Sequence, residues 1–316
     1  MRAVAVPRFR ARAELMDLPA PTCGPGEVLV GLDFAGMNPI DWKIADGLLG
    51  GSRPHVFPLV LGVDGAGVVE AVGSSVTRFR RGDRVFGQFL HDPVGTGTYC
   101  ELAPVPERIG IGPVPPGMRS DEAAALPTAG MTALASLDAL GLSPGATLVV
   151  VGASGGVGSI TTALATARGI RVVAVARASS SARLRSLGAE AVIDPSEAPS
   201  IPSLAKVDPA GIDGLLDLMS DAPGFARWAS VVRRGGAAVT TTYSANLESL
   251  REAGVRGVNI DLQPNAPLLE RLTHEVLESK LRAPVEHRVR LDAAPAALVD
   301  VKEGKASGKT VIDVRS

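Results

Sequence analysis

The sequence has little of several residue types that particular kinds of binding site require. Its 316 residues include only two cysteines, Cys23 and Cys100, too few for a disulfide framework or a four-cysteine zinc site. Aromatic residues make up 3 %, which argues against a stacking surface for single-stranded nucleic acid. The net charge is −1, so no basic excess indicates a nucleic-acid partner.

Long apolar runs are also missing. The segment from Met1 to Arg12 has no continuous apolar stretch of the kind that a signal peptide contains. Apolar runs such as Leu148–Val151 are far too short to span a bilayer. We therefore expect a soluble protein of the cytoplasm, with no membrane partner.

What is present is enough apolar sequence for two packed domains. Apolar residues make up 46 % and charged residues 21 %, and the length suits two domains of about 150 residues. Before the proline-rich stretch Pro113–Gly117, segments such as Glu27–Ala35 and Gly65–Gly73 are β-rich and bounded by glycine. They predict a small β-barrel or sandwich.

After this stretch, strand and helix patterns alternate. Asp121–Leu140 is rich in Ala and Leu and favours a helix. The following pattern predicts buried strands and helices that alternate, which is typical of a doubly wound parallel sheet. The strands are expected at Thr147–Val151, Arg171–Ala176, Leu215–Met219 and Ala237–Thr242, and one intervening helix at Ser179–Leu187.

The rest of the chain is less regular. Residues 195–209 carry four prolines and predict no helix. A last helix is expected at about Pro267–Leu281, and an extended segment at Thr310–Val314.

A glycine-rich turn follows the strand Thr147–Val151 and precedes a helix with apolar residues at helical spacing. Ala153-x-Gly155-x-x-Gly158 is the dinucleotide fingerprint with Ala at its first position, and the free N–H groups of the helix start favour a pyrophosphate. A tight turn without a ligand is the alternative. The expected cofactor-binding residues here are Gly152, Ser154, Gly155, Gly156, Val157 and Gly158.

The choice of cofactor is expected to be made at the end of the second strand. Sites for NAD place a carboxylate there for the ribose 2′-hydroxyl, but residues 172–183 contain none. Arg177, Ser179 and Arg183 would instead suit a 2′-phosphate, so the sequence predicts NADPH. The alternative is that these arginines only face solvent.

The segment from Asn38 to Lys43 begins a predicted helix. Asn38 at the N-cap, Pro39 at the first position and Asp41 at the third are residues that helix starts favour. This local role alone could explain them.

Several motifs occur along the chain in the same order as in a known family. They are Gly36-Met-Asn-Pro-Ile-Asp41, Leu61-Gly-Val-Asp-Gly-Ala-Gly67, Gly82-Asp-Arg-Val-Phe-Gly87, Leu126-Pro-Thr-Ala-Gly-Met-Thr132, the glycine-rich turn and Gly308-Lys-Thr-Val311. Together they resemble the quinone oxidoreductase branch of the medium-chain dehydrogenase/reductase superfamily, and Asn38–Lys43 is similar to alkenal/one oxidoreductases.

The resemblance implies an α/β fold with a GroES-like β-rich catalytic domain and a Rossmann cofactor domain. We expect the catalytic domain at residues 1–118 and 259–316 and the NADPH-binding domain at residues 119–258. A homodimer is expected from the habit of the family.

Zinc is not expected. Zinc-dependent relatives have Cys where Asn38 stands, a His-Glu pair where Val63 and Asp64 stand, and a third ligand near Leu126–Thr132, and this chain has none of them. The four histidines are scattered without ligand spacing.

The resemblance also implies site residues. Asn38 and Lys43 are the candidate donors to the substrate oxygen on which charge develops, although Lys43 is equally readable as a surface lysine. Thr128, Thr132, Thr242 and Tyr243 are expected at the cofactor, and Asp41, Trp42 and Tyr99 in the substrate pocket. For Trp42 and both tyrosines, packing is the alternative.

The leading functional interpretation is a zinc-independent, NADPH-dependent reductase of quinones or α,β-unsaturated carbonyls. The alternatives are an enoyl reductase that tailors a natural product on the same scaffold, and a non-catalytic NADPH-binding protein. The sequence does not separate them, because the shape of the pocket decides the substrate and the fold does not.

Overall fold

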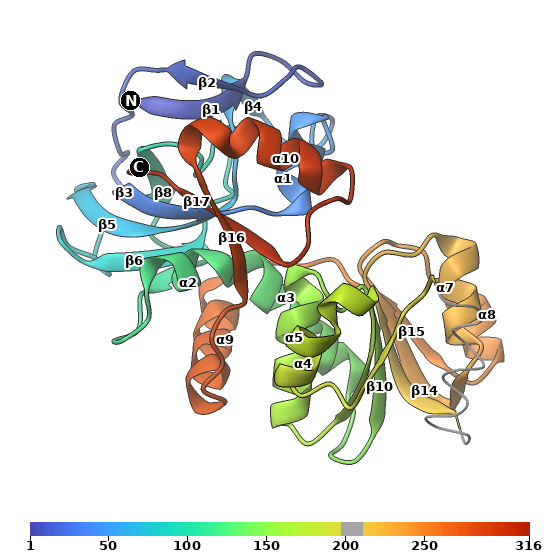
Figure 1. Cartoon of the computed structure of the whole chain (residues 1–316). Helices are drawn as coiled ribbons and strands as arrows, with labels where there is room; N and C mark the ends of the chain where they lie inside the picture. The colour runs from blue at the N-terminus through green and yellow to red at the C-terminus, as the bar shows by residue number, and fades with distance from the viewer. Residues whose placement is uncertain (197–210) are drawn as a thin grey trace. The chain divides into compact units, whose positions relative to one another are not determined.

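The computed structural model describes residues 1–196 and 211–316. The chain forms two compact units. Unit 1 comprises residues 1–129, 264–274 and 282–316, and unit 2 comprises residues 130–263 and 275–281 (Figure 1). The expected proline-rich segment 195–209 lies outside the described residues, apart from its first two.

Unit 1 is built from two sheets. One has the strand order β2-β1-β4-β7; the other has seven strands in the order β16-β17-β3-β5-β6-β9, with β8 paired to β3. The strands are β1 (Arg2–Val6), β2 (Glu14–Asp17), β3 (Glu27–Gly36), β4 (His55–Val60), β5 (Asp64–Val72), β6 (Arg84–Gln88), β7 (Val94–Thr96), β8 (Leu102–Pro106), β9 (Ile111–Pro113), β16 (Val285–Arg290) and β17 (Lys309–Asp313).

Buried aliphatic residues from both ends of the chain form one core in unit 1. Val4, Val30 and Leu61 pack in the same cluster as Leu291 and Ile312, each at most 1 % exposed. The C-terminal strand β17 lies between β16 and β3, which Figure 1 shows as red strands beside a blue one. The helices of this unit are α1 (Pro39–Ala45), α2 (Ser120–Ala125), η2 (Leu291–Ala293) and α10 (Ala294–Lys302).

In its described residues, unit 2 has a parallel sheet of six strands in the order β12-β11-β10-β13-β14-β15. The central strand β10 is buried along its whole length, as an all-parallel sheet with covered faces requires. The elements are β10 (Thr147–Val151), α4 (Gly156–Ala167), β11 (Arg171–Val175), η1 (Ala178–Ser180), α5 (Ser181–Ser186), β12 (Ala191–Ile193), β13 (Ile212–Asp217), α7 (Ala222–Ala229), β14 (Val232–Thr240), α8 (Leu247–Glu252) and β15 (Arg256–Asn259).

Two helices cross the boundary between the units: α3 (Pro127–Leu140) and α9 (Ala266–Glu278). The single helix expected at Asp121–Leu140 is two helices, because Pro127 lacks the N–H that a continuous helix would use. The expected fold class is confirmed: a β-rich unit and a unit with a parallel sheet whose strands alternate with helices.

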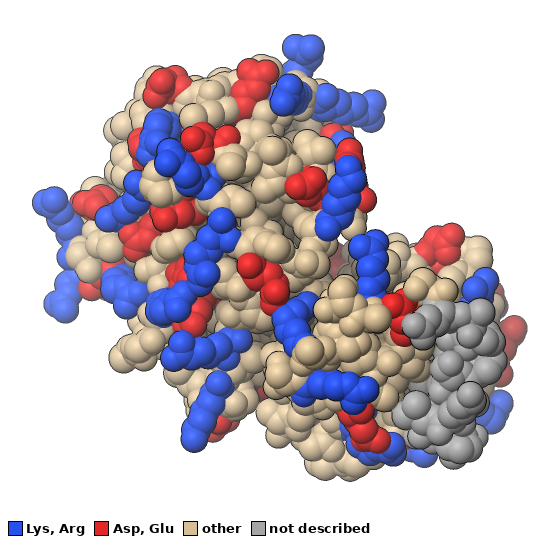
Figure 2. Space-filling view, viewed as in Figure 1, with Lys and Arg blue, Asp and Glu red and all other residues tan. Residues whose placement is uncertain are grey.

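The charged side chains are mixed by sign. On the face drawn in Figure 2, basic and acidic side chains are interspersed. Among the described residues, no helix is long and apolar enough to cross a membrane.

Candidate active site and cofactor loop

Helix α1 begins as its sequence predicts. Asn38 is the N-cap in extended conformation, Pro39 is the first helical residue, and the Asp41 carboxylate accepts a hydrogen bond from the Asn38 backbone N–H at 2.7 Å. Asp41 therefore caps the helix. The Asn38 side chain points elsewhere, into a buried polar cluster.

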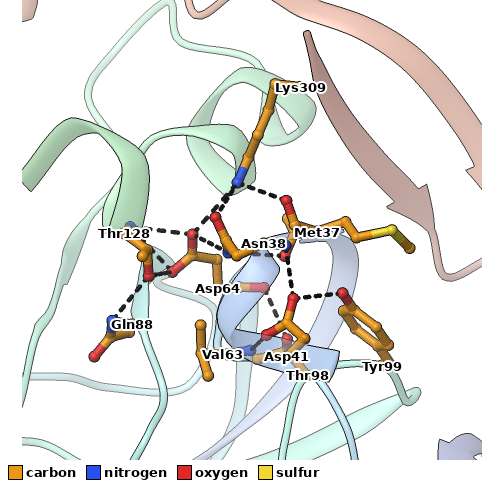
Figure 3. Close-up of polar contacts among 11 residues, drawn as sticks. Met37, Asn38, Asp41, Val63, Asp64, Gln88, Thr98, Tyr99, Thr128 and Lys309 are labelled. Carbon is orange, nitrogen blue, oxygen red and sulfur yellow. Dashed lines mark hydrogen bonds and ion pairs between the residues drawn. The ribbon is translucent and has the colours of Figure 1, made fainter. Parts of the chain in front are cut away.

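The Asn38 carboxamide lies between a cation and an anion (Figure 3). Its Oδ1 accepts a hydrogen bond from Lys309 Nζ at 2.6 Å, and its Nδ2 donates to Asp64 Oδ2 at 2.8 Å. The second Nδ2 hydrogen has only a long contact, 3.3 Å to the Gly36 carbonyl. Asn38 is 3 % exposed, so its amide is held in one environment.

The Asp64 carboxylate accepts hydrogen bonds from residues at the starts of two helices, α1 and α3. Besides Asn38, its carboxylate accepts the Thr128 backbone N–H at 3.0 Å and the Thr128 hydroxyl at 2.7 Å, and Gln88 donates to that hydroxyl at 2.8 Å. Complete burial raises the pKa of Asp64, against the opposing effects of Lys309 and the hydrogen bonds from Thr128 and Asn38. Thr128 is thus placed as a partner of the Asp64 carboxylate; its predicted contact with a cofactor stays a prediction.

Asp41 and Tyr99 form a second buried pair. The Tyr99 hydroxyl donates to Asp41 Oδ2 at 2.6 Å, and the Val63 backbone N–H donates to Oδ1 at 3.1 Å. Burial raises the pKa of Asp41 to about 7, although the bonds from Tyr99 and Asn38 lower it. Both residues are at most 1 % exposed. These contacts fit packing, the alternative that the sequence left open for Tyr99. Contact of Asp41 or Tyr99 with a substrate stays a prediction.

Lys43 and Trp42 lie on the next part of α1. The Lys43 ammonium is 5.7 Å from the centre of the Trp42 ring, and the Lys302 ammonium is 5.3 Å from it. The predicted contacts of Lys43 and Trp42 with a substrate stay predictions.

The glycine-rich turn in unit 2 joins β10 to α4. Gly152 has φ +82°, and Gly158 packs so closely that a Cβ there would lie 2.5 Å from the Gly152 carbonyl oxygen. Gly155, the N-cap of α4, is open: the nearest atom to a Cβ would be 3.5 Å away. This is the arrangement that brings backbone N–H groups close to a pyrophosphate.

The predicted 2′-phosphate residues lie around this turn. Arg183 on α5 donates to the Ser154 carbonyl and to the Ser159 hydroxyl, each at 2.8 Å, so it holds the turn itself. Arg177 and Ser179 are exposed at η1, after β11. Residues 172–183 contain no carboxylate, but Asp194, which follows β12, lies close to them in the fold: its carboxylate accepts a hydrogen bond from the Ala178 N–H at 2.6 Å.

The other predicted cofactor residues lie just after the carboxyl end of β14 or on α3. Thr242 follows β14 and donates to the Ser220 carbonyl at 2.9 Å. Tyr243 is 62 % exposed in left-handed conformation, with φ +58°. Thr132 is buried on α3.

A zinc ion does not fit the polar cluster. Zinc sites use thiolate, imidazole and carboxylate ligands, whereas Asn38 and Asp64 surround the Lys309 ammonium, which repels a cation. Among the described residues, no group of three His, Cys, Asp or Glu side chains could hold a metal ion.

Lys309, Asp64 and Gln88 were missed as site residues. Lys309 was noted only as part of the motif Gly308–Val311, and 271 residues separate it from Asn38. The available signal was charge: two of the motifs each carry an aspartate, Asp41 and Asp64, and buried carboxylates need a cation nearby.

Two family models match the chain. The "Alcohol dehydrogenase GroES-like domain" matches residues 24–118, and the "Zinc-binding dehydrogenase" model matches residues 156–261. A chloroplast envelope quinone oxidoreductase homolog of Arabidopsis thaliana is 30 % identical over 96 % of this chain and 94 % of its own length. An acrylyl-CoA reductase of Ruegeria pomeroyi is 32 % identical over 96 % and 93 %.

Solved structures agree with these relatives. A quinone oxidoreductase from Coxiella burnetii has a TM-score of 0.88 at 28 % identity, over 100 % of this chain and 99 % of that one. A mycobacterial protein solved with NADPH has a TM-score of 0.85 at 25 % identity, over 99 % and 100 %.

Proposed function

Since the chain belongs to the medium-chain dehydrogenase/reductase superfamily, in its quinone oxidoreductase branch, we propose that it is an NADPH-dependent reductase of quinones or α,β-unsaturated carbonyls that works without zinc. The chain is an oxidoreductase that binds a nicotinamide cofactor; the preference for NADPH and the substrate class belong to this proposal. Two observations carry it: unit 2 contains a dinucleotide turn, and unit 1 contains a buried cluster of an amide, a carboxylate and an ammonium group.

The residues around the turn fit a dinucleotide. The open backbone at Gly155 and the start of α4 would hold the pyrophosphate, and Arg177 and Arg183 supply positive charge near Ser179 for a 2′-phosphate. NADPH bound there supplies the hydride for the reduction.

The residues of unit 1 would act on the substrate oxygen. When hydride adds to an enone or a quinone, negative charge develops on that oxygen and a fixed donor stabilises it. The Asn38 N–H that has only the 3.3 Å contact to Gly36 is the donor we assign to it. Lys43, Trp42 and Thr132 remain proposals for pocket and cofactor contacts.

The experiment is NADPH consumption, with NADH in parallel, against benzoquinone, phenanthrenequinone, hexenal, methyl vinyl ketone and a crotonyl thioester. Turnover on quinones or enones supports the proposal. Turnover on the thioester alone favours an enoyl reductase, the activity that the acrylyl-CoA reductase relative suggests. NADPH binding with no turnover on any of the five contradicts it.

A first variant tests the assigned donor. Asn38→Ala should lower kcat by roughly a hundredfold, because a lost oxyanion donor costs on this order. Its affinity for NADPH, measured by fluorescence titration, should stay within about twofold of the wild type, since Asn38 contacts only residues of unit 1. Wild-type turnover in this variant would remove Asn38 from the mechanism.

A further inference from the structure

A lysine lies buried directly behind the proposed donor. Lys309 is the first residue of β17, and it is 3 % exposed. Its ammonium donates to Asn38 Oδ1 at 2.6 Å and to the Met37 carbonyl at 3.0 Å, and it lies 3.7 Å from Asp64 Oδ2. Burying an ammonium is costly, so its partners must be well placed to keep it there.

The lysine and the aspartate together fix which way the Asn38 amide faces. A lysine ammonium only donates hydrogen bonds and an ionised carboxylate only accepts them. Oδ1 must therefore face Lys309, and Nδ2 must face Asp64. A half-turn of the amide would place a donor against a donor and an acceptor against an acceptor, so only one orientation is favourable.

Lys309 also balances charge. The cluster holds two buried carboxyl groups, Asp41 and Asp64, and the described side chains place one ammonium against them. Without that ammonium, an ionised Asp64 would lie uncompensated beside the N–H that must stabilise negative charge on the substrate. The field of Asp64 would then oppose the charge that develops in the transition state.

We propose that Lys309 is a positioning residue for the reduction proposed above: it sets the orientation of the Asn38 carboxamide and neutralises Asp64. It acts through Asn38 and does not itself touch the substrate. The inference rests on the proposed function for its effect on catalysis, but the orientation of the amide is measurable without turnover.

The test compares Lys309→Met, which keeps the length of the side chain and removes its charge, with Lys305→Met. Lys305 is a matched control, because its side chain is 68 % exposed and forms a surface ion pair with Glu303. We expect Lys309→Met to lower kcat roughly tenfold to a hundredfold, the usual cost of removing a supporting contact, while KM for NADPH stays within about twofold. Lys305→Met should match the wild type.

Loss of a buried cation could unfold the variant, so a double variant accompanies it. Lys309→Met with Asp64→Asn removes both charges and leaves no uncompensated ion. We expect it to fold and to keep the low kcat, because nothing then fixes the orientation of the Asn38 amide. Wild-type kcat in either folded variant would overturn the proposal.

A readout independent of turnover separates this inference from the proposed function. The Asn38 side-chain amide signals, observed by selective asparagine labelling and assigned with Asn38→Ala, should move in Lys309→Met and not in Lys305→Met. Unmoved signals would overturn the positioning role. If the wild type reduces no substrate and the signals move, the proposed function fails and the positioning role stands.

Discussion

Asp41 shows how one buried side chain ties stability to pH. Its pKa is raised from 3.8 to about 7, chiefly by burial, so the fold disfavours its ionised form while the unfolded chain does not. Between about pH 4 and pH 7 the folded state binds the extra proton. Its contribution to stability is therefore present below about pH 4 and is lost as the pH rises towards 7.

This predicts a pH-dependent difference between the wild type and Asp41→Asn. The free energy of unfolding of the wild type, relative to that of the variant, should fall by a few kcal/mol from pH 4.5 to pH 7.5, at about 1.4 kcal/mol per pKa unit. Urea unfolding at three pH values measures it. The same comparison for the exposed residue Asp292, replaced by Asn, is the control. A difference for Asp41→Asn that stays constant with pH would contradict the raised pKa.

A second prediction at this scale concerns the choice of cofactor. Arg177→Ala should weaken NADPH binding by about tenfold or more and leave NADH nearly unchanged, because a charged hydrogen bond to the 2′-phosphate would be lost. Titration of both cofactors measures it, with Arg185→Ala on α5 as the control. Equal loss for both cofactors would refute the 2′-phosphate assignment.

At the residue scale, the sequence predicted the local partners and missed the distant one. The helix start at Asn38, Pro39 and Asp41 was readable, because a cap and its helix are neighbours in the chain. Lys309 was not assigned to the site, since nothing in residues 308–311 shows which buried oxygen atoms the fold brings to them.

At the element scale, the β10–α4 turn separates two uses of glycine. A Cβ at Gly158 would clash with the Gly152 carbonyl and with Ala153, so Gly158→Ala should lower stability by about 1–3 kcal/mol, as overpacking does. Gly155→Ala meets nothing closer than 3.5 Å and should keep its stability while it weakens NADPH binding. Thermal unfolding and titration test both. A stable Gly158→Ala, or a Gly155→Ala that binds normally, would count against this geometry.

The elements that the sequence predicted are those with strong local patterns. The β10 strand and the α4 helix follow from a continuous apolar run and from helical spacing. β16 was missed because four of its six residues are exposed charged or polar side chains, which gives it no strand pattern. Its pairing with β17 places it in the sheet.

At the scale of the whole molecule, β15 is the edge strand of the six-stranded sheet within the described residues. Such an edge presents unpaired backbone groups, and Leu247 on α8, next to β15, is 49 % exposed. The homodimer expected from the family stays a prediction, and this edge is the place where we test it.

Leu247→Glu should therefore shift the sedimentation mass from about twice 32.4 kDa to that of a single chain. Leu277→Glu is the matched control, because Leu277 is 50 % exposed and lies on a different helix, α9. A monomeric wild type, or a variant that remains dimeric, would rule out this interface.

The position of β17 in the sheet has a consequence for how the protein is made. Lys309 and Asn38 are 271 positions apart in the sequence. The ribosome therefore makes Asp64 long before it makes Lys309, the lysine that neutralises this aspartate. The described strands of unit 2, by contrast, lie within residues 147–259. In nascent chains stalled after residue 259, we expect unit 2 to resist protease while unit 1 is still cleaved. The proposed active site can then form only after Lys309 has been made, and no shorter nascent chain should reduce substrate.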